Sequence, residues 1–495
     1  MISTTDKASS SDFYLVRDYG AAGVAVKAET LELVQLNWKY LTYAPGQSVQ
    51  LRRLAEGAEL DSLGIQRAID AAHSAGGGRV LVPTGHYLIG PIELKSRVTL
   101  QLAPGAFLWA SPDLSDYAMS AETPANRGKV AGFNRDKAGL NQPLRRLISA
   151  YDAEDVSIVG TGRIEAQCQT WVFPWMNAVP EGHWPTERPG DTLYFMNCQR
   201  VRIEGIQLLN NPSWGIVLDG CQEVWVRGIR LRSFDVVNAD GIDIVNSSQV
   251  TISDCHLHTM DDAICLKNTN SAAKVHSITV TNCVIRTLCN ALKLGTDSLG
   301  DFEGICFSNI VVRNEFDDIK SAEGGISISA MDGGSMRNII CHNIAMHNVR
   351  CPIYIVSECR RTQQSERPEP IPGTICNVSI SGVVADATGS PCFIVGQPEA
   401  PVRGVTIENV RIRKSGGFYK EAPHSTVPER PEQYPGPDMF GSRDNDQLPA
   451  CGVYLRHAEE VYISNFTQEN TESDCRELIV QEKSAEVELH RTRLL

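Results

Sequence analysis

The sequence predicts an all-β chain wound into a single-stranded parallel β-helix. A short unit recurs along it: an alternating strand, a small polar or Cys turn, then a second alternating strand. Near the middle, successive units start 23, 26, 28 and 27 residues apart. A unit this short cannot bury its apolar side alone, but stacked units share one continuous core. A β-propeller would need roughly 40 residues for each four-stranded blade, so a β-helix fits the spacing better.

The copies of this unit span most of the chain. They begin at Val156, Val201, Val224, Val250, Ile278, Ile305, Ile339, Val378, Val405 and Val461. The wider gaps between copies indicate loop insertions. Residues 166–190 are rich in Trp and Pro, and residues 415–449 carry Phe418, Tyr419, Tyr434 and Phe440 among many prolines. Disorder is the alternative for the second insertion, given its Pro and charge content, but its aromatic residues favour packed loops that wall a cleft.

The chain is expected to divide near residue 60. Residues 1–60 form an N-terminal extension with the first strands and a candidate small β insertion, and residues 61–495 form the β-helix catalytic domain. A helix is predicted at 62–75. Asp61 or Ser62 is the candidate N-cap, and glycines 76–78 end the helix. Its predicted apolar face consists of Leu63, Ile65, Ile69 and Ala72, and we expect it to cap the open end of the coil.

Composition excludes several classes of function. With 46 Lys and Arg against 59 Asp and Glu, the net charge is −13, which argues against nucleic-acid binding. No apolar run approaches the roughly 20 residues of a membrane helix. The start, MISTTDKASSSDFYLV, lacks the pattern of a signal peptide, which indicates a cytoplasmic location without deciding it. The fifteen cysteines form no CxxC pair, so we expect buried thiols and neither a metal nor a cofactor. We also expect a monomer.

The candidate chemistry lies in two matching segments. NADGIDIV and MDDAICLK align so that Asp240 falls over Asp262, with Asp261 one residue earlier. Rungs of a β-helix are about 4.8 Å apart, so these carboxylates are expected to be neighbours. Like charges raise one another's pKa, which leaves one group protonated and others ionised, as glycosidic hydrolysis requires. The alternatives are turn-capping aspartates or a Ca²⁺ site.

The order of motifs resembles glycoside hydrolase family 28, the polygalacturonase and rhamnogalacturonan hydrolase type. The resemblance covers DYGAAG, AIDAAHSAGGGRVLVPTGHYLIGPIELKSRVTLQL, LISAYDAEDVSIVGTGRIEA, NADG, DDAICLK and the closing YPGPDMFG with LPACGVYLRH. It implies a right-handed coil, inversion of the anomeric centre, Asp261 as general acid, and Asp240 with Asp262 activating water. Members of this family are often exported, which leaves the location unknown.

Two rungs depart from the family signature of Asn-Thr-Asp, Asp-Asp, Gly-His-Gly and Arg-Ile-Lys. Asn290 stands where the histidine is expected, and Ser327 and Ser329 stand where the arginine and lysine are expected. In the family those cations hold the uronate carboxylate of the bound sugar. Lys293 is predicted to face outward between two leucines, and we hypothesise that it replaces them; an ordinary solvated lysine is the alternative.

Further candidates for substrate binding come from the same comparison. Asn238 opens the first motif, and Lys267 matches a lysine common in the family, although it could simply pair with a neighbouring aspartate. Trp214 resembles an aromatic residue at the cleft edge. Tyr354, expected to point outward, and Arg456 are candidates for sugar subsites.

The sequence thus predicts an inverting, exo-acting hydrolase of pectic poly- or oligosaccharides of the galacturonate or rhamnogalacturonan type. Its expected partner is an acidic plant carbohydrate, with neither nucleic acid nor a membrane involved. A β-helix polysaccharide lyase and a non-catalytic carbohydrate-binding β-helix are the alternatives.

Overall fold

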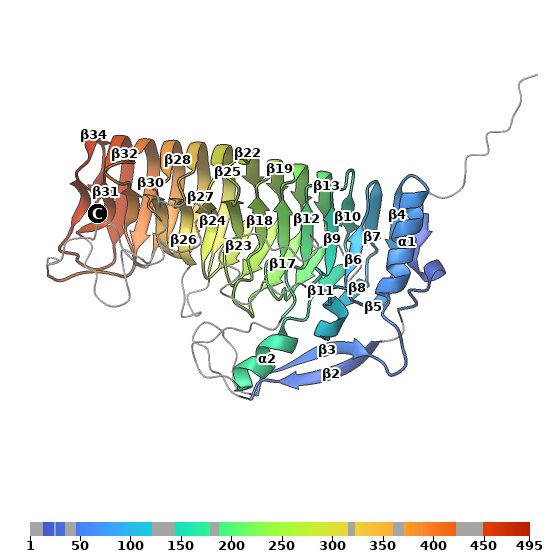
Figure 1. Ribbon diagram of the computed structural model, residues 1–495. Coiled ribbons are helices and arrows are strands. Elements are labelled where there is room, and N and C mark those ends of the chain that lie inside the picture. The colour runs from blue at the N-terminus through green and yellow to red at the C-terminus, as the bar shows by residue number, and fades with distance from the viewer. Residues whose placement is uncertain are drawn as a thin grey trace, which may run out of the picture.

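The computed structural model describes residues 13–23, 26–34, 46–120, 144–178, 188–314, 322–359, 371–387, 389–421 and 449–495. Across these ranges one parallel sheet of 33 strands winds into an elongated coil, which Figure 1 shows as a row of stacked rungs. Each strand pairs with its counterpart one rung away, so the coil presents three sheets. The predicted parallel β-helix is confirmed.

The first sheet consists of β6 (Ile92–Leu94), β9 (Ile148–Tyr151), β12 (Leu193–Met196), β15 (Ile216–Asp219), β18 (Ile242–Val245), β21 (Ile264–Asn268), β24 (Asn290–Ser298), β26 (Ala322–Ala330), β29 (Cys392–Val395), β31 (Ala450–Arg456) and β33 (Glu477–Glu482).

The second sheet, along the top of Figure 1, consists of β1 (Phe13–Leu15), β4 (Gly78–Val82), β7 (Val98–Leu102), β10 (Ser157–Gly160), β13 (Gln199–Glu204), β16 (Gln222–Arg227), β19 (Ser248–Ser253), β22 (Lys274–Thr281) and β34 (Ala485–His490).

The third sheet consists of β5 (Gly85–Ile89), β8 (Ala106–Ala110), β11 (Arg163–Glu165), β14 (Gln207–Leu209), β17 (Arg230–Ser233), β20 (His256–Thr259), β23 (Val284–Thr287) and β35 (Arg493–Leu494). Five long strands continue from the second sheet into the third: β25 (Asp301–Arg313), β27 (Ser335–Ser357), β28 (Thr374–Ala387), β30 (Val402–Lys414) and β32 (Ala458–Asn470). Of these, β27 runs on to pair with the first-sheet strands β26 and β29.

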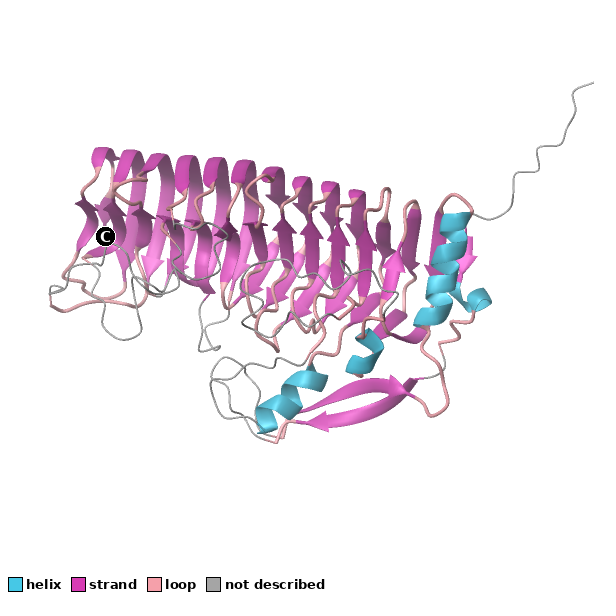
Figure 2. Cartoon of the chain, viewed as in Figure 1, coloured by secondary structure: helices cyan, strands magenta, loops and turns pink. Residues whose placement is uncertain are grey.

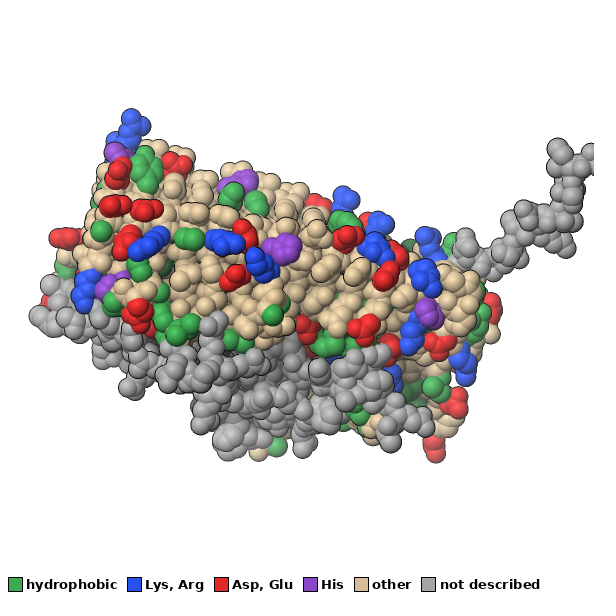
Figure 3. All heavy atoms as spheres, turned by 45° about the horizontal axis from the view of Figure 1, so that its top comes forward, with side chains coloured by type: hydrophobic (Ala, Val, Ile, Leu, Met, Phe, Trp, Pro, Cys, Tyr) green, Lys and Arg blue, Asp and Glu red, His purple; other side chains and the backbone are tan. Residues whose placement is uncertain are grey.

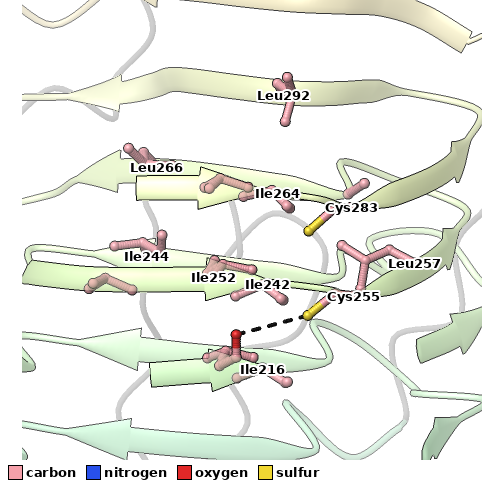
Figure 4. Close-up of a cluster of buried hydrophobic side chains, with 14 of the residues drawn as sticks. Ile216, Ile242, Ile244, Ile252, Cys255, Leu257, Ile264, Leu266, Cys283 and Leu292 are labelled. Atoms are coloured by element: carbon pink, nitrogen blue, oxygen red, sulfur yellow. Dashed lines mark hydrogen bonds between the residues drawn. The ribbon is translucent and has the colours of Figure 1, made fainter. Parts of the chain in front are cut away.

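Alternation along each strand builds the core. Ile216, Ile242, Ile264 and Leu292 occupy one register position on successive rungs, and all four are buried inside the coil (Figure 4). Apolar burial at every rung is the main driving force for stacking. The cysteines follow the same rule: all fifteen are free thiols, and ten of them are buried, as expected.

The predicted capping helix is present as α1 (Ser62–Ser74), which covers the first rung beside β1, β4, β6 and β7. Two details of that prediction were wrong. Asp61 does not cap the helix, because its carboxylate accepts hydrogen bonds from the amides of Gly23 (2.9 Å) and Leu88 (3.1 Å) instead. Leu63 lies on the outer side of the helix and is exposed, whereas Ile65, Ile69 and Ala72 are buried.

The candidate β insertion is an antiparallel hairpin of β2 (Val26–Glu32) and β3 (Ser48–Leu54), separate from the coil (Figure 2). It lies beside α2 (Gln169–Ala178), which belongs to the Trp- and Pro-rich insertion. The Asn177 side chain accepts a hydrogen bond from the amide of Val34 (3.0 Å) and donates one to the carbonyl of Glu32 (3.3 Å). Two short 3₁₀ helices, Val16–Tyr19 and Leu114–Tyr117, complete the elements.

Some predicted features lie outside the described residues: Tyr434, Phe440 and the YPGPDMFG motif. Phe418 and Tyr419 of the same insertion are described, and Tyr419 stacks under the Arg476 guanidinium at 3.9 Å. Within the described ranges, every helix is too short or too polar to cross a membrane.

Candidate active site

The predicted alignment of the two aspartate segments is confirmed. Strands β18 and β21 pair with Ile242 opposite Ile264 and Ile244 opposite Leu266. Asp240 and Asp262, each two residues before its strand's first isoleucine, therefore occupy one position on adjacent rungs. The same register places Trp214 one rung before them and Asn290 one rung after.

Asp262 is the most completely hydrogen-bonded of the three carboxylates. Its Oδ1 accepts from the backbone amide (3.1 Å) and side-chain amide (2.7 Å) of Asn290, and its Oδ2 accepts from Lys293 Nζ at 2.7 Å. Burial alone would raise the pKa of this carboxyl, but the ammonium groups of Lys293 and Lys267 outweigh burial and hold the pKa well below its usual range. Asp262 is therefore ionised.

Asp240 belongs to a buried ionic cluster. Lys267 Nζ lies 2.6 Å from Asp243 Oδ1 and 3.2 Å from Asp240 Oδ2, and it sits 4.3 Å from the centre of the Trp214 ring. Burial and the Asp243 charge raise the pKa of Asp240 well above its ordinary value. Burial would lower the pKa of Lys267, but Asp243 and Asp240 together raise it. Lys267 therefore pairs with neighbouring aspartates, which is the alternative that the sequence analysis gave for it.

Asp261 differs from its two neighbours because its side chain is less enclosed. Its Oδ1 accepts a hydrogen bond from the Asp262 amide at 2.9 Å. Burial and the adjacent Asp262 charge raise the pKa of the Asp261 carboxyl, while Lys293 opposes them. The pKa values of these two adjacent carboxyl groups are thus shifted in opposite directions. The raised pKa of Asp261 favours its protonated form, and the lowered pKa of Asp262 favours its ionised form.

Two threonines that we did not predict hold the turn that carries Asp261. The hydroxyls of Thr259 and Thr287 donate to the Asp261 carbonyl at 2.7 and 2.6 Å. They face each other on the last residues of β20 and β23. Their recurrence at the end of VTISDCHLHT and TVTNCVIRT is a signal that the sequence did contain.

The two departures from the family signature contact each other. Ser327 Oγ donates to Asn290 Oδ1 at 2.6 Å, which leaves the amide nitrogen of Asn290 to donate to Asp262. Ser327 also lies opposite Lys293 in the register of β24 and β26. The serine at the expected arginine position thus orients the asparagine at the expected histidine position.

Lys293 faces outward from the coil, as predicted, but it is not an ordinary solvated lysine. Only 11% of its side chain is exposed, and its ammonium group is bound to Asp262. In this arrangement the cation binds the Asp262 carboxylate. Its hypothesised role toward a substrate carboxylate stays a prediction.

Two predicted subsite residues are buried. Tyr354 points away from the core as expected, but it is fully buried and makes an edge-to-face contact with Phe393, whose ring centre is 5.6 Å away. Arg456 is 1% exposed and lies over the Tyr454 ring at 5.9 Å. The roles of both residues in sugar subsites stay predictions.

Asn238 remains at the edge of the site. Its left-handed backbone (φ 56°) is one that Asn tolerates. Its Oδ1 accepts from Arg188 Nη2 at 3.3 Å, and Arg188 also donates to the Val237 carbonyl at 2.9 Å. Arg188 was not anticipated from sequence, because it lies in an irregular insertion.

Among the residues that the structure describes, one group of side chains has metal-ligating atoms close together. Asp261, Asp262 and Cys289 each present such an atom within 4.8 Å of the others. Burial, followed by the Asp262 charge, raises the pKa of the Cys289 thiol well above its ordinary value. Sulfur is foreign to Ca²⁺ sites, which use oxygen ligands. The donor set therefore fits a calcium-dependent lyase poorly.

Comparison with known proteins decides the family. Residues 79–429, most of the chain, match the family described as "Glycosyl hydrolases family 28". The chain belongs to this family. It is therefore a glycoside hydrolase, in line with the sequence prediction.

Polygalacturonases are among its relatives. A probable polygalacturonase of Vitis vinifera is 25% identical over 375 residues, 72% of each chain. A probable exopolygalacturonase B of Neosartorya fischeri is 22% identical over 54% of this chain and 61% of its own.

Solved structures share the fold. The family 28 exopolygalacturonase of Yersinia enterocolitica has a TM-score of 0.62 and 17% identity, over 97% of this chain and 78% of its own. The exopolygalacturonase of Thermotoga maritima has a TM-score of 0.58 and 21% identity, over 81% and 87%. The coil is the right-handed parallel β-helix of these enzymes.

Proposed function

We propose that this enzyme hydrolyses glycosidic bonds in pectic oligo- or polysaccharides of the galacturonate or rhamnogalacturonan type, from a chain end and with inversion. The observation that carries the proposal is the unlike surroundings of two adjacent carboxyl groups. Asp262 is bound by Lys293 and Asn290, whereas Asp261 is less enclosed and accepts a hydrogen bond from the Asp262 amide. Glycoside hydrolysis by inversion needs one carboxylic acid and one carboxylate at the scissile bond. The polygalacturonase relatives support the pectic substrate class.

In this proposal Asp261 is the general acid. Its raised pKa keeps a proton available for the glycosidic oxygen, which otherwise leaves as an unstable alkoxide. Asp262, already ionised, accepts the proton of the attacking water. Because its pKa is low, transfer to it is late, when the water oxygen has gained positive charge by bonding to the anomeric carbon. Asp240 orients the same water from the neighbouring rung.

An added wall beside the site supports action at a chain end. A hydrophobic cluster outside the coil joins Leu33, which directly follows β2 within the hairpin, and Phe173 of α2 to Val237, Ala239 and Met260, which flank the catalytic aspartates. The hairpin and α2 are thus packed directly against the segments that carry the chemistry. Such a wall closes one direction to a long chain.

The serines at 327 and 329 bear on which sugar is bound. Both are buried, neutral hydroxyls, and the nearest described ammonium in this register, that of Lys293, is bound to Asp262. A neutral sugar beside this rung therefore suits the site better than a uronate does. This favours rhamnogalacturonan-type substrates over plain polygalacturonate.

A panel of pectic oligosaccharides tests the proposal. We expect one sugar unit or a few units to be released at a time from the chain end. The products should show no new absorbance in the near ultraviolet, and a chelator should not reduce the activity. Unsaturated, ultraviolet-absorbing products with chelator sensitivity would identify a lyase. Binding without turnover across the whole panel would identify a carbohydrate-binding protein.

Replacing Lys293 by Met separates its two candidate roles. Without the ammonium the pKa of Asp262 rises, so the acid side of the pH profile of kcat should move to higher pH by about one unit or more. KM should change little. The pH dependence of kcat and KM measures this, with exposed Lys274→Met as control. A raised KM for acidic substrates at unchanged kcat would instead assign Lys293 to substrate binding.

A further inference from the structure

A groove of about 530 Å³ lies on the second sheet, the face formed by β10, β13, β16 and β19. The catalytic aspartates precede strands of the first sheet, so the groove belongs to a different face of the coil. Figure 3 brings the top of Figure 1 forward and shows acidic, basic and apolar side chains interspersed along that face. The groove takes no part in the hydrolytic mechanism described above.

Trp225 is the centre of the groove. Its side chain projects from the middle of β16, and 48% of the residue is exposed. It is in register with Arg202 on the preceding rung and Thr251 on the following one. Because successive rungs pair in register, the indole stands in one column with residues of the neighbouring rungs.

Hydroxyl, guanidinium and carboxylate groups surround the indole in the groove. Ser157 and Ser253 offer hydroxyls, and Arg200, Arg202 and Arg227 offer guanidinium groups. The carboxylates of Asp155 and Glu204 also line the groove, where they pair with Arg200 and Arg202. The ion pairs of these arginines lie at the surface: Arg227 is 3.2 Å from Asp254, with side-chain exposures of 67% and 42%. Exposed pairs of this kind contribute little free energy, so a ligand carboxylate can replace the partner at low cost.

This combination has the chemistry of an acidic saccharide site. An exposed aromatic face packs against the C–H face of a sugar ring by dispersion. Hydroxyl groups meet the sugar hydroxyls, and arginine forms two-pronged hydrogen bonds with carboxylates. The protein carries a net charge of −13, so an acidic polymer needs local cations of this kind to be held.

We propose that the Trp225 groove is an accessory binding site for a uronate-bearing polysaccharide, separate from the active site. It rests on the proposed function, because it assigns the substrate polymer a second point of attachment. The site holds the polymer while its chain end is processed elsewhere on the same molecule. Short oligosaccharides, which fill only the active site, gain nothing from it.

Affinity electrophoresis through gels containing polygalacturonate tests this proposal, with a short oligosaccharide added to saturate the active site. We expect retardation of the unaltered enzyme, and a dissociation constant raised at least 5-fold in Trp225→Ala. Hydrolysis of the short substrate should stay within 2-fold. Ile340→Ala is the matched control, because Ile340 lies in the same column four rungs later and is also 48% exposed.

A double variant, Arg202→Ala with Arg227→Ala, tests the acidic nature of the ligand. It should weaken retention by polygalacturonate and leave retention by a neutral galactan unchanged. Equal retention of Trp225→Ala and the unaltered enzyme would overturn the site, and an arginine variant that still binds the acidic polymer normally would overturn the ligand class. Absence of pectic hydrolysis by the unaltered enzyme is a different result, since it contradicts the proposed function.

Discussion

Replacing Asp261 by Asn is expected to lower kcat by about 10²–10⁴-fold, the usual contribution of a general acid. The amide keeps the size and shape of the side chain and can still accept the hydrogen bond from the Asp262 amide, so KM should change little. Steady-state release of reducing sugar measures the effect. Asp152→Asn is the matched control, because Asp152 is an exposed turn residue with positive φ, a conformation that Asn also tolerates.

The pH profile of the same variant provides an independent test. Activity requires Asp261 protonated and Asp262 ionised. The pKa of Asp261 is raised and that of Asp262 is lowered, so activity in the unaltered enzyme falls as pH rises through the Asp261 value. Asp261→Asn has no proton to lose there, and its residual activity should not show that decline. A variant that keeps full turnover, or the same alkaline decline, contradicts the assignment.

Replacing Lys267 by Met is expected to destabilise the protein by about 3–5 kcal/mol at pH 7, because it leaves Asp240 and Asp243 buried without their counter-charge. Met matches the length of the lysine stem and can keep the contact with Trp214. The shift of the denaturation midpoint measures the effect, with Lys274→Met again as the exposed control. A loss below about 1 kcal/mol would mean that the cluster is not held together by this charge.

The pH dependence of this loss has a definite sign. Without the lysine, the pKa of Asp240 in the folded state rises further above the unfolded value of about 3.9. A raised carboxyl pKa favours the folded state at low pH, and that advantage disappears as pH rises through the folded value. The stability gap between Lys267→Met and the unaltered enzyme should therefore narrow from pH 7 toward pH 4. A gap that widens on acidification would contradict the account.

The repeat was sufficient to predict how the catalytic residues come together. In a parallel coil, two segments with the same pattern one rung apart must place equivalent residues side by side, which predicted that Asp240 and Asp262 share one column. Asn290 was assigned to the next rung only by the family signature, and the register confirms that rung. The outward direction of Lys293 followed from the same alternation, since Leu292 and Leu294 on either side point into the core.

Alternation could not predict which outward residues remain accessible. Tyr354 leaves the coil in the expected direction, but it is buried in a cluster with Phe393 and Tyr454. Likewise, the period of the pattern does not specify the partner that a long, flexible side chain selects. Lys293 reaches back one rung to Asp262, and Ser327 bonds to Asn290, because buried charges and polar groups need partners in three dimensions.

The insertions were the least predictable part. The segment 24–60 could be identified only as a candidate β element, because irregular composition carries no register that relates it to the coil. Its packing against α2 and the turns of Val237 and Met260 depends on apolar side chains from four distant segments. Arg188, which donates a hydrogen bond to Asn238, lies in another irregular insertion and was not predicted for the same reason.

Hydrolysis of the best pectic oligosaccharide, followed by proton NMR from the first turnover, tests the central claim most directly. If Asp261 delivers the proton while Asp262 and Asp240 activate water on the opposite side, the first sugar released carries the anomeric configuration opposite to that of the bond cleaved. The account predicts this inverted anomer, which then equilibrates by mutarotation. Initial release of the anomer with the original configuration would require a covalent intermediate and would contradict the roles assigned to all three aspartates.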